Sequence, residues 1–187
     1  MSIIVDEFGF SNITQVIMGA HRILQLGDPV LREVSIPVEN LADARGCLDD
    51  LRDTLHEFQR THGFGRGISA IQIGVRIRAI YIELDGAAYG LINPEYEWLS
   101  QERFRLWDDC FSFPDLRVLL ERSQALRLRY MDEHGGTQMV DASGALAELI
   151  QHEMDHLDGI LAVDRAIGPN GLATREQWQA ARSLRPN

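Results

Sequence analysis

The segment from Leu149 to Gly159 reads LIQHEMDHLDG, and it contains His152, Glu153 and His156 in the order H-E-x-x-H. In an α-helix, residues four positions apart lie on the same face, so both imidazoles can bind one metal ion with the glutamate beside them. Several unrelated classes of hydrolase share this motif, and they differ in the third metal ligand. The identity of that ligand therefore determines what the site does.

The motif is predicted to lie on a helix that runs from about Ser143 to Leu157. Leu146, Leu149 and Ile150 form its apolar side, and Gly159 follows at the position that favours a C-terminal cap. A helix with this apolar side is expected to be largely buried, and buried histidines need polar partners. A metal site is therefore favoured over two surface histidines.

Other segments predict further helices and strands. Helical spacing of apolar residues predicts a first helix over 42–61, and REQWQAARSL (175–184) predicts a terminal helix. Alternation predicts a strand in AIYIEL (79–84) and a strand followed by a turn in ALRLRYMDEHGG (125–136), and GLINPE predicts a strand that ends at Pro94. Helices and strands without regular β-α alternation indicate an α+β fold with antiparallel sheet.

Length and composition restrict the class of protein. A chain of 187 residues is predicted to form one domain over 21–187, preceded by an extension over 1–20. The net charge of −10 argues against nucleic-acid binding through general electrostatics. The chain has no apolar run long enough to span a membrane, and acidic residues stand where a signal peptide carries positive charge. Two cysteines suit a reducing compartment, so a cytoplasmic protein is expected.

The third ligand is not found in the downstream sequence. One large class continues the motif as H-E-x-x-H-x-x-G-x-x-H, with a third histidine as ligand. Gly159 matches the glycine of this pattern, but Ala162 occupies the position of the third histidine. Another class takes a glutamate from a later helix, and Glu176 lies at a plausible distance without any supporting pattern. Upstream, Cys110 stands in a short segment between two strand-like regions, whereas Cys47 is interpreted as a buried thiol in the first helix. A thiolate with two imidazoles leaves a fourth position open for water, as in catalytic sites.

With Cys110 included, the chain resembles the peptide deformylase family. The resemblance rests on three motifs in order: GRGISAIQ (Gly65–Gln72), DDCFS (Asp108–Ser112) and QHEMDHLDG (Gln151–Gly159). They are similar to the family's G-x-G-L-A-A-x-Q, E-G-C-L-S and Q-H-E-x-D-H-L-x-G. The resemblance covers about 23–165 and implies antiparallel β-sheets packed around a central H-E-x-x-H helix, with an N-terminal and a C-terminal helix.

The resemblance implies a role for each conserved position. Metal ligands would be Cys110, His152 and His156, holding one divalent ion, commonly Fe²⁺, with Zn²⁺, Ni²⁺ or Co²⁺ as other choices. A metal-bound water is more acidic than free water, and Glu153 can take its proton and deliver it to the departing amine. The Gln72 side-chain amide and the Phe111 backbone N–H would bind the developing oxyanion.

The resemblance also implies the enzyme's activity and its partners. It implies a metallohydrolase that cleaves the formamide C–N bond of N-terminal formylmethionine on nascent polypeptides. The expected partners are N-formylated peptides and, transiently, the ribosome. Substrate-binding positions would be Gly67, Arg66, Arg117 and Glu148.

Several residues near the site depart from the family pattern. Asp109 replaces a glycine, so a positive φ there would be strained, and Asp108 is one methylene shorter than the usual glutamate. Arg66 and Glu148 replace apolar residues of the pocket for the methionine side chain, and Ala145 is smaller than usual.

These departures leave two structural and three functional interpretations. Arg66 and Glu148 either swing outward from a working methionine pocket or pair inside a wider, polar pocket for another N-formyl substrate. The chain is accordingly a deformylase, a related amidase for a non-methionine N-formyl substrate, or a catalytically weak homologue that binds metal or peptide. The intact residues Gln72, Cys110, His152, Glu153 and His156 argue against the last alternative.

Overall fold

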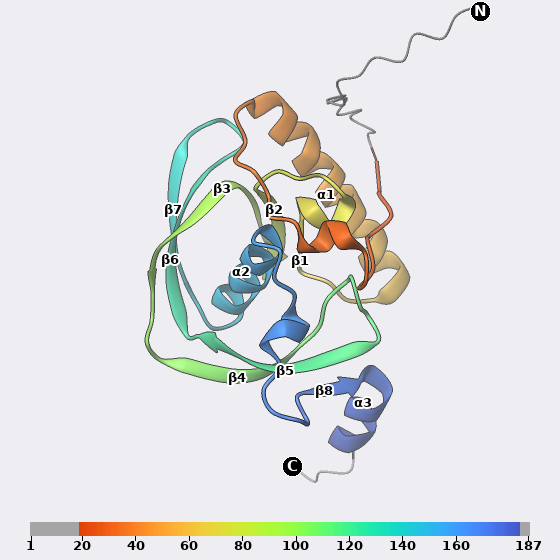
Figure 1. The fold of residues 1–187 in the computed structure, drawn as a ribbon. Helices are drawn as coiled ribbons and strands as arrows, with labels where there is room; N and C mark the ends of the chain where they lie inside the picture. Colours follow the sequence, from red (N-terminus) through yellow and green to blue (C-terminus); the bar gives the residue numbers. More distant parts are fainter. Residues whose placement is uncertain (1–18, 184–187) are drawn as a thin grey trace, which may run out of the picture.

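The computed structural model describes residues 19–183, which form two antiparallel sheets, three α-helices and three short 3-10 helices (Figure 1). Of the predicted extension over 1–20, residues 1–18 lie outside the described residues. The elements are η1 Pro29–Arg32, α1 Leu41–His62, β1 Gly67–Ser69, η2 Ala70–Ile73, β2 Ala79–Leu84, β3 Ala87–Leu99, β4 Arg103–Asp108, β5 Leu116–Ser123, β6 Ala125–Met131, β7 Thr137–Ser143, α2 Gly144–Leu157, η3 Ala162–Arg165, β8 Leu172–Thr174 and α3 Arg175–Ser183.

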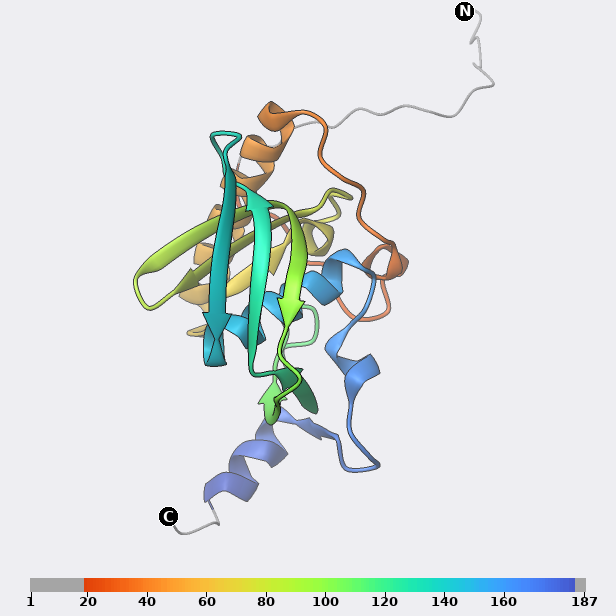
Figure 2. The same ribbon diagram turned by 90° about the vertical axis from the view of Figure 1, so that its left-hand side faces the viewer.

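The sheets surround α2, the helix that carries the H-E-x-x-H motif. The larger sheet has the strand order β1-β2-β3-β6-β7, and the smaller one has the order β4-β5-β8. Figures 1 and 2 show α2 inside the curve of the larger sheet, with α1 on one side and α3 at the far end of the smaller sheet. The predicted α+β class, with antiparallel sheets packed around this helix, is confirmed.

Helix α2 begins and ends close to the predicted residues. Ser143 is its N-cap, and Gly159 follows the C-cap residue with φ 70°. A side chain at Gly159 would also place its Cβ 2.6 Å from the carbonyl oxygen of Arg32, so both backbone conformation and space require glycine. Apolar residues of α2, including Ile150 and Leu157, pack against β2, β3 and β6 in one buried cluster. This packing fixes the position of the motif's polar face.

Helix α1 follows its predicted pattern. Its buried apolar residues belong to a cluster that also contains residues of β1, η2 and β3. The members from α1 are Ala44, Cys47, Leu48, Leu51, Leu55 and Phe58. Burial, with a contribution from Asp50, raises the pKa of the Cys47 thiol to about 12, which suits the predicted role as a small apolar side chain. On α3, Glu176 is exposed, as expected for a solvated helix residue.

One predicted element is wrong. The strand expected to end at Pro94 continues to Leu99 as β3. Asn93 adopts φ 48°, and the register of β3 against β6 shifts between Ile92 and Glu95. Proline, which cannot donate to a ladder, is tolerated at such a bulge, so it bends the strand without ending it. Within residues 19–183, no helix has the length and apolar character needed to cross a membrane.

Candidate metal centre and active site

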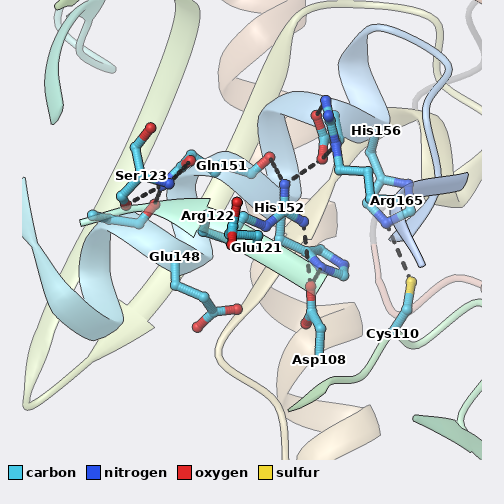
Figure 3. A network of polar contacts seen from close by, with 12 residues as sticks. Asp108, Cys110, Glu121, Arg122, Ser123, Glu148, Gln151, His152, His156 and Arg165 are labelled. Atoms are coloured by element: carbon cyan, nitrogen blue, oxygen red, sulfur yellow. Dashed lines mark hydrogen bonds and ion pairs between the residues drawn. The ribbon is translucent and has the colours of Figure 1, made fainter. Parts of the chain in front are cut away.

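Three predicted metal ligands lie together at the centre of the molecule. Cys110 lies in the turn between β4 and β5, and His152 and His156 lie one turn apart on α2. Their ligand atoms are within 4.8 Å of one another and all three residues are buried. The Cys110 Sγ is 3.2 Å from the His156 Nε2, a contact marked by a dashed line in Figure 3.

The donor atoms fit a divalent transition metal ion. Tetrahedral coordination with the usual bond lengths places a thiolate sulfur and an imidazole nitrogen about 3.6 Å apart, close to the Cys110–His156 separation. One thiolate and two imidazoles are ligands that first-row divalent ions accept. Because the Nδ1 of His152 is hydrogen-bonded to Asp108, its Nε2 is the nitrogen left for a metal ion.

A buried network of charged residues holds the His152 ring through its Nδ1 atom. The Asp108 Oδ2 lies 2.9 Å from the His152 Nδ1 and 3.2 Å from the Arg122 Nη2. Arg122 also donates to Asp155, which forms a two-pronged ion pair with Arg165. Asp108 therefore reaches His152 although it is one methylene shorter than the glutamate of the family motif, and it fixes the orientation of the ring.

The environments of the two histidines differ in charge. Burial lowers the pKa of His152, but Asp108 and Cys110 together outweigh burial, and the pKa lies well above its ordinary value. Burial, together with the positive charge of His152, lowers the pKa of His156 well below its ordinary value. As candidate ligands, His156 would therefore be neutral and His152 would be made more basic by Asp108.

Glu153, the residue after His152 on α2, lines the same cavity as Cys110 and His152. Its Oε2 accepts a 2.5 Å hydrogen bond from the Ser69 hydroxyl, and Ser69 also donates to the Glu153 carbonyl oxygen at 3.0 Å. Burial raises the pKa of Glu153, while His152 and the Ser69 hydrogen bond act in the opposite direction. Gly67 lies so close that an added Cβ would be 2.9 Å from the Glu153 Oε1. A buried carboxylate of raised pKa suits proton transfer.

Gln72 and Phe111 flank the candidate ligand Cys110. The Gln72 Nε2 lies 3.6 Å from the Cys110 Sγ and 3.3 Å from the Ser112 Oγ, and its Oε1 accepts from the Ser69 N–H at 2.9 Å. The Phe111 ring is held by stacking on Phe58, with 3.9 Å between centroids. Within residues 19–183, the Phe111 backbone N–H has no hydrogen-bond partner, so it is available to a ligand.

A cavity of about 390 Å³ opens onto these residues. Its wall includes Cys110, His152 and Glu153, and also Arg66 and Glu148. The Arg66 Nη2 lies 2.8 Å from the Glu148 Oε2, which confirms the predicted pairing. The Glu148 side chain is 5% exposed, so the interpretation in which both side chains swing outward is wrong. Burial raises the pKa of Glu148, and Asp108 adds to this rise while Arg66 opposes it.

Arg117, predicted to bind the substrate backbone, lies on β5 and outside the group of residues that wall the cavity. Its Nη1 is 2.6 Å from the Asp109 Oδ2, and Asp109 does line the cavity. Asp109 is not among the described residues with positive φ, so the strain that a positive φ would cause does not arise. The substitution of glycine by Asp109 instead places a carboxylate between Arg117 and the cavity.

The sequence prediction missed Ser69, Arg122 and Asp155, which hold the site residues in place. Ser69 and Asp155 stand inside quoted motifs, but neither was assigned a role. Arg122 had a readable signal: in LRVLLERS (116–123), it continues the alternate positions of Val118 and Leu120, all of which are buried. A charged residue on the buried face of a strand predicts a buried ionic partner.

Known proteins are similar to this chain in sequence and in fold. The family model described as polypeptide deformylase matches residues 20–170. A peptide deformylase of Bartonella tribocorum is 39% identical over 155 residues, covering 79% of this chain and 84% of that protein. The crystal structure of peptide deformylase from Thermotoga maritima has a TM-score of 0.74 at 30% identity and covers 79% of this chain and 98% of that one. A peptide deformylase from Synechococcus elongatus in complex with actinonin has a TM-score of 0.75 at 28% identity, covering 91% and 99%. The chain belongs to the polypeptide deformylase family.

Proposed function

We propose that this chain removes the N-formyl group from the N-terminal residue of nascent polypeptides and releases formate. Membership of the polypeptide deformylase family makes the chain a deformylase-type hydrolase. One observation supports placing the reaction in the cavity beside Cys110, His152 and Glu153. The Glu153 carboxylate lines the same cavity as Cys110 and His152, and Gln72 lines it too. Proton transfer, metal binding and oxyanion binding therefore converge on one space.

The metal ion would be held by Cys110, His152 and His156. The chemistry that such an ion supplies when bound is a water of lowered pKa, so that hydroxide is present near neutral pH. We propose Fe²⁺ as the native ion, with Zn²⁺, Ni²⁺ or Co²⁺ able to replace it, because one thiolate and two imidazoles suit all four. Metal quantification on protein prepared without oxygen tests this choice.

The chain's own residues then divide the reaction between them. Glu153 accepts a proton from the attacking water and later gives it to the amine that leaves, which keeps the amine from departing as an anion. The Gln72 Nε2 and the Phe111 N–H donate to the oxygen of the formyl group as negative charge develops on it. Ser69 holds both Glu153 and Gln72 in place through the contacts described above.

The cellular setting follows from the substrate. Nascent chains carry their formyl group at the ribosome, so we propose a transient contact with the ribosome in the cytoplasm. Cys47 and Cys110 are both buried and neither forms a disulfide, which supports a reducing compartment.

Replacing Glu153 with alanine tests the proposed function. Formate release from a formylated peptide is expected to fall by roughly 10²–10⁴-fold, because the general acid–base is lost. The bound metal should be retained, since its three ligands are unchanged. Glu176→Ala, at an exposed position on α3, is the matched control and should leave turnover unchanged. Unchanged turnover in Glu153→Ala would contradict the mechanism, and the alternative of a catalytically weak binding protein predicts no turnover in the parent protein.

A further inference from the structure

The ion pair of Arg66 and Glu148 lies where the first residue of a formylated substrate must sit. Glu148 is one turn before the candidate ligand His152 on α2, and polar atoms of Asp108, Glu148 and His152 lie within 4.8 Å of one another. Arg66 comes from the loop before β1 and lines the same cavity. One residue of extended chain spans only about 3.5 Å. A formamide held at the ligands therefore places the first side chain beside this pair.

The pair still has hydrogen-bonding capacity left for a ligand. Arg66 donates from its Nη2 to the Glu148 Oε2 at 2.8 Å. Among residues 19–183, neither the other Glu148 oxygen nor the Arg66 Nε and Nη1 forms a further hydrogen bond. The cavity wall thus presents free donors and a free acceptor side by side.

The other carboxylates of the cavity wall are each bonded through one oxygen, as Glu148 is, but to partners that do not present free donors to the cavity. Asp108 is shared between His152 and Arg122. Asp109 is bound by two arginines, and Glu153 accepts from Ser69. Glu148 differs in that its partner, Arg66, also lines the cavity and keeps unbonded N–H groups, so this pair offers donors and an acceptor together.

An apolar side chain fits this wall poorly. It would remove water from the guanidinium N–H groups and from the carboxylate oxygen without replacing the lost hydrogen bonds, which is costly at a partly buried ion pair. A charged side chain also fits poorly, because a cation would compete with Arg66 for Glu148 and an anion would compete with Glu148 for Arg66. A neutral polar group satisfies the free positions and leaves the pair intact.

We propose that Arg66 and Glu148 make the pocket for the first side chain selective for a neutral hydrogen-bonding group, such as a carboxamide or a sulfoxide, over an apolar side chain of the same length. The inference rests on the proposed deformylase activity and narrows it: N-formylated chains with a neutral polar first side chain are preferred over those that begin with formylmethionine, whose side chain is apolar. Arg66 and Glu148 act as specificity-determining residues, and the reaction itself stays with Glu153 and the metal ligands.

The test is a panel of formylated tripeptides that differ only in the first residue. Norleucine and methionine represent apolar side chains, glutamine and methionine sulfoxide represent neutral polar ones, and lysine and glutamate represent charged ones. With metal-loaded protein, kcat/KM for the glutamine and sulfoxide peptides is expected to exceed that for the norleucine peptide by about tenfold, the effect of one hydrogen bond to a charged group. The lysine and glutamate peptides should be the slowest.

A double variant identifies the residues responsible. Arg66→Leu/Glu148→Leu removes both charges together, so neither is left unpaired in the wall. Its kcat/KM for norleucine and methionine peptides should rise above that for glutamine, with metal content unchanged. The matched control is Arg127→Leu/Asp141→Leu, which removes an exposed ion pair of 2.6 Å between β6 and β7 and should keep the parent's order of preference.

The panel separates failure of this inference from failure of the proposed function. Rapid formate release with norleucine or methionine preferred over glutamine overturns the polar pocket and leaves the deformylase function standing. A preference for lysine or glutamate also overturns it, because the pair would then bind a charge. No formate from any peptide, with the metal bound, overturns both. The panel with the parent protein decides these outcomes even if the double variant does not fold.

Discussion

The Asp109 Oδ2 lies 2.6 Å from the Arg117 Nη1, so the residue just before the candidate ligand Cys110 is anchored to β5. The same oxygen is 3.2 Å from the Nη2 of Arg175, the first residue of α3. The Arg175 guanidinium also lies 4.2 Å from the centroid of the Phe64 ring, and Phe64 lines the cavity. Through Asp109, the C-terminal helix is therefore connected to the wall of the candidate active site.

Replacing Asp109 with asparagine is expected to lower the free energy of unfolding by about 2 kcal/mol. The Arg117 and Asp109 side chains are only 13% and 23% exposed, so loss of the carboxylate leaves a poorly solvated guanidinium without its partner. Denaturant unfolding measures the change. Asp141→Asn, whose side chain is 70% exposed, is the control and should change stability by less than about 0.5 kcal/mol. Equal changes in the free energy of unfolding for both variants would show that the Asp109–Arg117 ion pair does not stabilise the protein.

The Gly67→Ala variant is predicted to lose turnover and keep its metal. The added Cβ would lie 2.9 Å from the Glu153 Oε1 and 3.1 Å from the Leu149 Cδ1, so the carboxylate must move. Misplacing a catalytic group by about 1 Å can reduce the rate on the order of 10²-fold, and kcat for formate release measures it.

Gly90→Ala is the matched control for this variant. Its added Cβ would meet the Leu48 Cδ1 at the same 2.9 Å, but on β3 and away from the cavity. We expect Gly90→Ala to lower stability and to leave kcat close to that of the parent protein. A similar fall in kcat for both variants would mean that crowding in the sheet, and not displacement of Glu153, is responsible.

Much of the fold and the candidate ligands could be predicted because the signals are local. The 3.6-residue periodicity of α1 and α2 depends on neighbouring residues only, and it already placed Glu148 on the face of His152. The pairing with Arg66 followed because a buried carboxylate needs a partner. The motifs then brought Cys110 to the same site through resemblance to the family.

What could not be predicted depends on contacts distant in sequence. The passage of β3 through Pro94 requires a bulge that forms only against β6. The contact between Asp109 and Arg175 requires α3 to pack beside the turn that holds Cys110, and no periodicity in either segment indicates this. Local patterns and the family motifs therefore predicted the candidate chemical residues but not the residues that hold them in place.

Replacing the buried Arg122 with methionine should destabilise the protein by about 3–5 kcal/mol. The side chain is 3% exposed and bridges Asp108 to Asp155, so its loss leaves the buried Asp108 without an arginine partner, while Asp155 keeps Arg165. Because Asp108 also orients His152, metal affinity should fall roughly 10–100-fold. Thermal unfolding and metal titration measure the two effects. The control is Arg105→Met, because the Arg105 side chain is 66% exposed. Parent-like stability in Arg122→Met would refute the structural role of this network.

Replacing Ser69 with alanine is expected to move the acid limb of the pH profile of kcat/KM to higher pH. Burial is the main cause of the raised pKa of Glu153, and the hydrogen bond from the Ser69 hydroxyl opposes it by stabilising the ionised carboxylate. Loss of that hydrogen bond raises the pKa further. Since Glu153 must be ionised to accept a proton, activity then appears only at higher pH. Measuring kcat/KM for formate release over a range of pH, with parent and variant loaded with the same metal, checks the sign. An acid limb that stays in place or moves to lower pH would show that Ser69 does not control the ionisation of Glu153.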